Sequence, residues 1–139
     1  MATIRKDINV PADATTAWDA VRDFGGLHHR LVPGFVIDTR VEGGDRVVTF
    51  ASGVEATERL VALDDDRRRL VYAVVDSPLG AAHQQASVEV LDDPATGGSR
   101  VVWTMDLLPD ELAPFVDGMM DQGTQAIERA LRASTVPST

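Results

Sequence analysis

The stretch LAPFVDGMMDQGTQAIERAL, residues 112–131, decides the fold. Its apolar side chains recur at spacings of three and four residues, which is the spacing of one face of an α-helix. These positions are Leu112, Phe115, Val116, Met119, Met120, Gly123, Ala126, Ile127, Ala130 and Leu131. Pro114 is tolerated only in the first turn of a helix. The stretch therefore predicts a long amphipathic helix that must bury its apolar face against the rest of the chain.

Upstream of this helix the sequence alternates in the pattern of β-strands. The predicted strands cover residues 4–10, 35–41, 46–51, 57–63, 70–75, 85–91 and 100–107. Short turns, such as the one at Gly43 and Gly44, join antiparallel neighbours. After the first strand we expect a helix capped by Asp13 and a second short helical turn over residues 27–31. The predicted fold is α+β, with a curved, seven-stranded antiparallel sheet wrapped around the long C-terminal helix.

Composition excludes several classes of protein. The 139 residues contain no cysteine, which excludes disulfide scaffolds and thiolate metal sites. Thirteen Lys and Arg against 22 Asp and Glu give a formal charge of -9, the wrong sign for a nucleic-acid binder. No apolar run approaches the roughly 20 residues of a membrane span, and the N-terminus has no signal-peptide core. We expect a cytoplasmic protein without stable membrane association.

The chain reads as one domain. No repeat, low-complexity segment or linker divides it, so the predicted domain covers residues 1–133 and is followed by a flexible tail over residues 134–139. Homodimerisation is left open by these residues.

Several motifs in this order resemble the START-like superfamily, also called helix-grip or SRPBCC proteins. They are VRDFGGL at 21–27, TERL at 57–60, LDDD at 63–66, LVY at 70–72, VVW at 101–103 and the C-terminal helix. The resemblance covers about residues 3 to 133 and is greatest to the bacterial polyketide cyclase/dehydrase-type branch, with some similarity to plant abscisic acid receptors. It implies a helix-grip fold with a ligand cavity between sheet and helix. The superfamily holds carriers, receptors and cyclases, so the fold alone does not define the function.

The last strand and the long helix supply the first candidate ligand-binding residues. Trp103 and Met105 share a strand face that should meet Phe115, Met119, Met120 and Gly123 on the helix. Methionine side chains adapt to variable contents, which favours a pocket, although plain core packing explains the same pattern. On another strand Tyr72 and Val74 share a face, and the resemblance places Tyr72 in the cavity.

Glu58 is the most specific candidate for chemistry. It shares a strand face with Leu60, and the matching glutamate of the receptor family lies in the pocket. A carboxylate in an apolar cavity can act as an acid, a base or a hydrogen-bond partner. The alternative is a surface ion pair with Arg46 or Arg59.

Register decides the role of the strand at 85–91. Apolarity turns Val88 and Val90 inward, whereas the receptor resemblance turns Gln85 and Ser87 into the pocket; we favour the latter. The loops at 52–56 and 77–83 resemble the gate and latch of those receptors, but the latch's His-Arg-Leu and the gate's proline are absent. Both departures argue against hormone-receptor behaviour.

The histidines lack metal-ligand spacing, so we expect no metal and no cofactor. The resemblance implies polar ligand contacts at the pocket entrance, where we expect His29 and Arg30. The favoured function is binding or transport of a small hydrophobic or aromatic ligand. The first alternative is a polyketide cyclase or dehydratase that uses acid–base side chains, with Glu58 and Tyr72 as its catalytic candidates. The groups available for acid–base chemistry are these two together with His29 and Arg30. The second is a protein-interaction module, which a cavity filled by Trp103, Met119 and Met120 would favour.

Overall fold

A computed structural model describes residues 1–133; the expected flexible tail, residues 134–139, lies outside the described residues. The strands are β1 (Ala2–Val10), β2 (Val36–Glu42), β3 (Asp45–Phe50), β4 (Glu55–Asp64), β5 (Arg69–Asp76), β6 (His83–Asp92) and β7 (Ser99–Leu108). The helices are α1 (Ala14–Arg22) and α2 (Ala113–Ala133), and three short helical turns are η1 (Phe24–Gly26), η2 (Leu27–Leu31) and η3 (Asp110–Leu112). This element order is the predicted one.

The strands form one antiparallel sheet in the order β1-β7-β6-β5-β4-β3-β2. Strands β2 to β7 follow one another as a meander, and β1 adds beside β7, so the predicted sheet is confirmed. Gly43 has a φ of +63° in the turn between β2 and β3, a conformation that favours glycine. Register shifts interrupt the β2–β3 and β4–β5 pairings. Such irregularities bend strands, which helps the sheet to curve.

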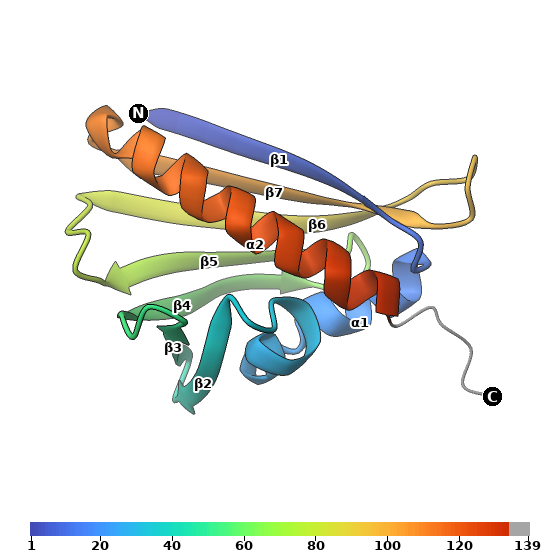
Figure 1. Ribbon diagram of the computed structural model, residues 1–139, viewed down its shortest axis with the longest axis horizontal. Helices are drawn as coiled ribbons and strands as arrows, with labels where there is room; N and C mark the ends of the chain where they lie inside the picture. The colour runs from blue at the N-terminus through green and yellow to red at the C-terminus, as the bar shows by residue number, and fades with distance from the viewer. Residues whose placement is uncertain (134–139) are drawn as a thin grey trace.

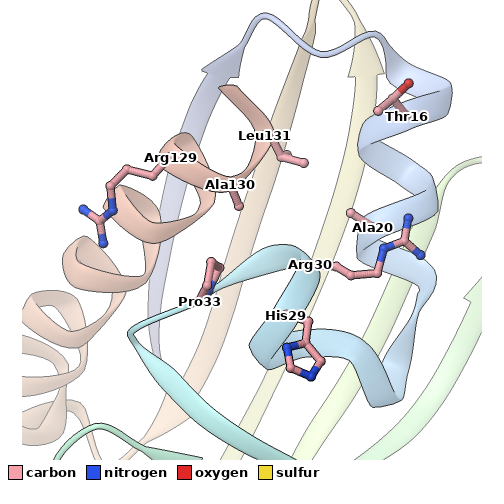
Figure 2. Close-up of a pocket in the computed structure, with 8 residues that line it drawn as sticks. All are labelled: Thr16, Ala20, His29, Arg30, Pro33, Arg129, Ala130 and Leu131. Atoms are coloured by element: carbon pink, nitrogen blue, oxygen red, sulfur yellow. The ribbon is translucent and has the colours of Figure 1, made fainter. Parts of the chain in front are cut away.

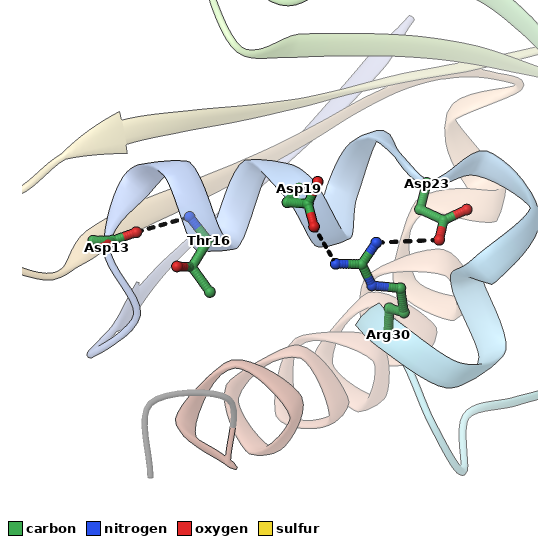
Figure 3. Close-up of polar contacts among 5 residues, drawn as sticks. All are labelled: Asp13, Thr16, Asp19, Asp23 and Arg30. Atoms are coloured by element: carbon green, nitrogen blue, oxygen red, sulfur yellow. Dashed lines mark hydrogen bonds and ion pairs between the residues drawn. The ribbon is translucent and has the colours of Figure 1, made fainter. Parts of the chain in front are cut away.

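Helix α1 begins where the sequence predicts it. Asp13 accepts a hydrogen bond from the backbone amide of Thr16 at 2.7 Å, which caps the helix (Figure 3). That bond lowers the pKa of Asp13. Trp18 is buried, and its indole N–H donates to Asp65 in the turn between β4 and β5. Helix α1 is thereby tied to the sheet as well as packed against it.

Helix α2 lies across one face of the sheet, and α1 and η2 lie beside its C-terminal half (Figure 1). Val116, Met120, Ile127 and Leu131 are buried on the face that the spacing predicts. On the polar side, Lys6 of β1 binds Asp117 and Asp121 at 2.6 and 2.8 Å. No helix within residues 1–133 is long and apolar enough to cross a membrane.

Candidate functional site

A cavity of about 560 Å³ lies between the sheet, η2 and α2. The elements that enclose it include β2 to β7, and most of its lining is apolar. The lining residues are Leu27, Leu31, Val32, Phe35, Val36, Arg46, Phe50, Ala51, Ser52, Val54, Ala56, Glu58, Tyr72, Val74, Ser77, Pro78, Leu79, Gln84, Val88, Trp103, Met105, Phe115, Val116, Met119, Met120, Gln122 and Ile127. Val54 and Phe115 are exposed as well as lining, so the mouth lies between the β3–β4 loop and the start of α2.

Eight of the predicted ligand-binding residues line this cavity. They are Glu58, Tyr72, Val74, Trp103, Met105, Phe115, Met119 and Met120. The strand residues among them lie on the concave face, since alternate positions of a strand share a face. Their contact with a ligand stays a prediction.

The expectation that Gln85 and Ser87 face the cavity is wrong. Register places Ala86 beside Met105 and Val88 beside Trp103, so the even-numbered positions of β6 face α2. Ala86, Val88 and Val90 are accordingly buried. The polar lining residue of β6 is Gln84, whose amide nitrogen lies 3.3 Å from the sulfur of Met105. Burial of the apolar face determined the register, as the alternation of the residues had indicated.

Gly123 is not one of the residues that line the cavity. It lies behind Trp103, which does line it. A Cβ atom at this position would lie 2.9 Å from the indole ring of Trp103 and 3.3 Å from Phe35. The absence of a side chain therefore lets the Trp103 ring approach the α2 backbone. Gly123 shapes the cavity through Trp103 rather than by contact with its contents.

The expectation that His29 and Arg30 lie at the cavity entrance is also wrong. They line a separate hollow of about 480 Å³ between α1, η2 and the end of α2 (Figure 2). The reason is local, because Leu27 and Leu31 are the residues of η2 that turn toward the core and the cavity. His29 and Arg30, which lie between these two positions, are exposed.

Arg30 is held by two carboxylates of the preceding segment. It donates hydrogen bonds to Asp19 of α1 and to Asp23 just after it (Figure 3). The bond to Asp19, followed by that to Asp23, raises the pKa of Arg30, and Arg30 lowers the pKa of Asp19. The charge of Arg30 is thus compensated within the protein by Asp19 and Asp23, so Arg30 is not a strong anion-binding group.

The sequence left open whether Glu58 lies in the cavity or forms an ion pair with an arginine, and the structure shows both. It lines the cavity, and it also pairs with Arg46, whose Nε donates to a Glu58 carboxylate oxygen at 2.8 Å. The pair is not at the surface, since Arg46 is 4% and Glu58 7% exposed. The two residues lie directly opposite each other on β3 and β4. Their mutual compensation allows two charges to be buried in a mostly apolar wall.

Tyr72 is the second polar group of the wall. Its hydroxyl oxygen accepts a hydrogen bond from the indole N–H of Trp103 at 3.2 Å. Burial, and then the negative charge of Glu58, raises the pKa of Tyr72. The hydroxyl therefore keeps its proton at any physiological pH and can donate it in a hydrogen bond. Within residues 1–133, no group of three or more His, Cys, Asp or Glu side chains could hold a metal ion.

Sequence reasoning missed several lining residues. Arg46 was considered only as a surface partner of Glu58, yet its position in the hairpin register opposite Glu58 could have placed it in the wall. Leu27 and Leu31 are four residues apart in a predicted helical turn, and that spacing could have assigned them to one inward face. Phe35 was predicted as the first residue of a strand, but it lies in the turn just before β2.

Comparison with known proteins places this architecture in a family. Residues 1–133 match the family model described as polyketide cyclase/dehydrase and lipid transport. The fold is similar to that of the protein XoxI from Bacillus cereus, with a TM-score of 0.84, 19% identity, and 94% of this chain and 96% of that chain covered. A Thermobifida fusca protein is 29% identical, with a TM-score of 0.74 over 94% of this chain and 91% of that chain.

A plant enzyme shares the fold at greater distance. It is norcoclaurine synthase from Thalictrum flavum, solved as a point mutant in complex with a transition-state analogue. The TM-score is 0.66 at 19% identity, with 94% of this chain and 93% of that chain covered. The fold is thus the helix-grip fold that the sequence predicted, and the match over residues 1–133 shows that the chain belongs to the polyketide cyclase/dehydrase and lipid transport family.

Proposed function

We propose that the protein binds a small, mostly apolar molecule in the cavity between the sheet and α2. The observation that supports this most is the cavity itself, which has about 560 Å³ of space although apolar side chains surround it. Protein interiors are otherwise packed as densely as organic crystals. Pockets for small molecules typically have volumes of about 300–1,000 Å³ and combine apolar walls with a few polar groups.

The lining argues against the interaction-module alternative. That hypothesis expected Trp103, Met119 and Met120 to fill the space, and instead all three lie along its walls. Membership of a family described by polyketide cyclisation and lipid transport also favours a ligand inside the domain.

Binding is better supported than the cyclase or dehydratase alternative. Of the four acid–base candidates, His29 and Arg30 lie at the other hollow. Glu58 and Tyr72 remain in the cavity, and one Glu58 oxygen already accepts a hydrogen bond from Arg46. An organised pair of acid and base on either side of a substrate is therefore not formed by the four candidates.

The test uses two tryptophan substitutions on neighbouring positions of β5. Val74 lines the cavity, whereas Val75 is 45% exposed on the opposite face of the strand. Val74→Trp should fill part of the cavity, and Val75→Trp should leave it unchanged. Binding of naphthalene to the wild type and both variants would be measured by equilibrium dialysis, with circular dichroism to show that each variant is folded.

We expect the wild type and Val75→Trp to bind naphthalene equally. Folded Val74→Trp should bind naphthalene at least about tenfold more weakly, because the new indole ring takes up space that naphthalene occupies, and the apolar surface that naphthalene can then no longer bury is worth more than about 1.4 kcal/mol. Equal loss in both variants would overturn the proposal, as would a wild type that binds neither naphthalene nor its hydroxylated analogue 2-naphthol.

A further inference from the structure

The buried pair of Arg46 and Glu58 gives one wall of the cavity a fixed polar group. The Arg46 guanidinium lies 4.1 Å from the centroid of the Phe24 ring and 5.2 Å from that of Tyr72. It donates to the backbone carbonyl of Phe24 at 3.2 Å and to Glu58 at 2.8 Å. Stacking and hydrogen bonds from several sides hold the guanidinium in place, and Arg46 in turn orients Glu58.

Glu58 has hydrogen-bonding capacity that the protein leaves unused. An ionised carboxylate offers about four acceptor positions on two oxygens. Within residues 1–133, the Glu58 carboxylate accepts one hydrogen bond, which comes from Arg46 and uses one of its two oxygens. Because Glu58 lines the cavity, its remaining capacity is available to whatever occupies that space.

Tyr72 contributes a complementary donor in the same cavity. Its oxygen already accepts from Trp103, and no residue in the described part of the chain accepts its own proton. Glu58 and Tyr72 lie on adjacent strands, where Glu58 is paired with Val74 and Leu60 with Tyr72. Side chains so placed are diagonal neighbours on one face of a sheet.

We propose that the ligand carries a neutral hydroxyl group that donates a hydrogen bond to the free capacity of Glu58; this rests on the proposed function above. A hydroxyl gains a charge-assisted hydrogen bond there without burying another charge. An anionic group would meet the Glu58 carboxylate, and the charge of Arg46 is already compensated by that carboxylate. A pure hydrocarbon would displace water from Glu58 and leave the carboxylate oxygens short of partners, which is costly.

Four probes that share the naphthalene ring and differ in the group at position 2 test the proposal at neutral pH. 2-Naphthol has a hydroxyl donor, 2-methoxynaphthalene an oxygen without a proton, 2-naphthoate a negative charge, and naphthalene no polar group. Equilibrium dialysis should show 2-naphthol binding about tenfold to a hundredfold more tightly than naphthalene and 2-methoxynaphthalene. We expect 2-naphthoate to bind more weakly than 2-naphthol.

The double variant Arg46→Met with Glu58→Leu tests the residues. Replacing both partners avoids an unpaired buried charge, and such replacements generally fold. It should lose the preference for 2-naphthol and bind naphthalene at least as tightly as the wild type does, because no carboxylate is then left short of partners. The matched control is Asp45→Asn with Arg59→Gln, which removes an exposed ion pair one register position along the same two strands and should keep that preference.

The outcomes separate this inference from the proposed function. If none of the four probes binds, the proposed function fails. If naphthalene or 2-methoxynaphthalene binds as tightly as 2-naphthol, if 2-naphthoate binds best, or if the Arg46 and Glu58 double variant retains the preference, the hydroxyl inference is overturned while the cavity remains a binding site. Should the double variant not fold, the ranking of the four probes on the wild type decides the matter.

Discussion

Tyr72 is the only tyrosine of the chain, so its ionisation can be followed without interference from another phenol. Burial raises its pKa above the ordinary value of 10.0. The folded protein therefore keeps a proton that the unfolded chain loses above pH 10, and folding stability must fall as the pH rises beyond that value.

This predicts the result of an alkaline absorbance titration. Phenolate absorbance in native protein should stay absent above pH 10 and appear only when the protein unfolds, whereas the urea-unfolded chain should titrate near 10. Tyr72→Phe, as the control, should lose less stability above pH 10 than the wild type. A native titration near 10 would show that the hydroxyl is open to solvent and not buried in the cavity wall.

The pair of Arg46 and Glu58 makes a second prediction at this scale. Arg46→Met leaves Glu58 as an uncompensated buried charge and should lower the free energy of unfolding by about 3–5 kcal/mol. Adding Glu58→Leu should recover most of that loss, because the second change removes the unpaired charge. Urea denaturation of the single and double variants measures both. If the two losses simply add, the residues do not form a coupled buried pair.

At the scale of the helix, two glycines of α2 have different surroundings. A Cβ at the exposed Gly118 would meet no heavy atom within 4 Å, whereas one at Gly123 would lie 2.9 Å from Trp103. Gly118→Ala should stabilise the protein by about 0.5–1 kcal/mol through helix propensity alone. Gly123→Ala gains the same propensity but crowds Trp103, and overpacking costs about 1–3 kcal/mol.

Thermal and urea unfolding of the two variants would check this. Gly118→Ala should be more stable than the wild type and Gly123→Ala less stable. An equal gain in both would mean that Trp103 does not pack closely against α2, and the wall of the cavity would have to be described differently.

The elements also show what the residues could reveal in advance. The inward face of α2 and that of β7 were predictable, because period and burial agree over many residues. In β6 the alternation indicated the observed register, and a resemblance to distant proteins outweighed it; a shift by one residue exchanged Gln84 for Gln85. In η2 the four-residue spacing of Leu27 and Leu31 indicated the inward residues, and a resemblance to distant proteins again outweighed it in placing His29 at the cavity entrance.

Over the whole molecule, the cavity depends on contacts between segments far apart in the chain. The fold order followed from the sequence, since each element has its own local signal. The pairing of Arg46 with Glu58 depends instead on register across a hairpin, and Phe35 reaches the cavity from a loop. The open space itself depends on how closely sheet and helix approach, which no local pattern encodes.

The methionines can report whether a ligand enters this cavity. The chain has four, of which Met105, Met119 and Met120 line the cavity while Met1 is 66% exposed. Their methyl groups, labelled with carbon-13, give separate NMR signals that a bound aromatic ring shifts. Titration with 2-naphthol should shift the signals of the three cavity methionines and leave that of Met1 unchanged. If 2-naphthol binds and the three cavity signals stay in place, the ligand site lies elsewhere and the cavity is not the binding site.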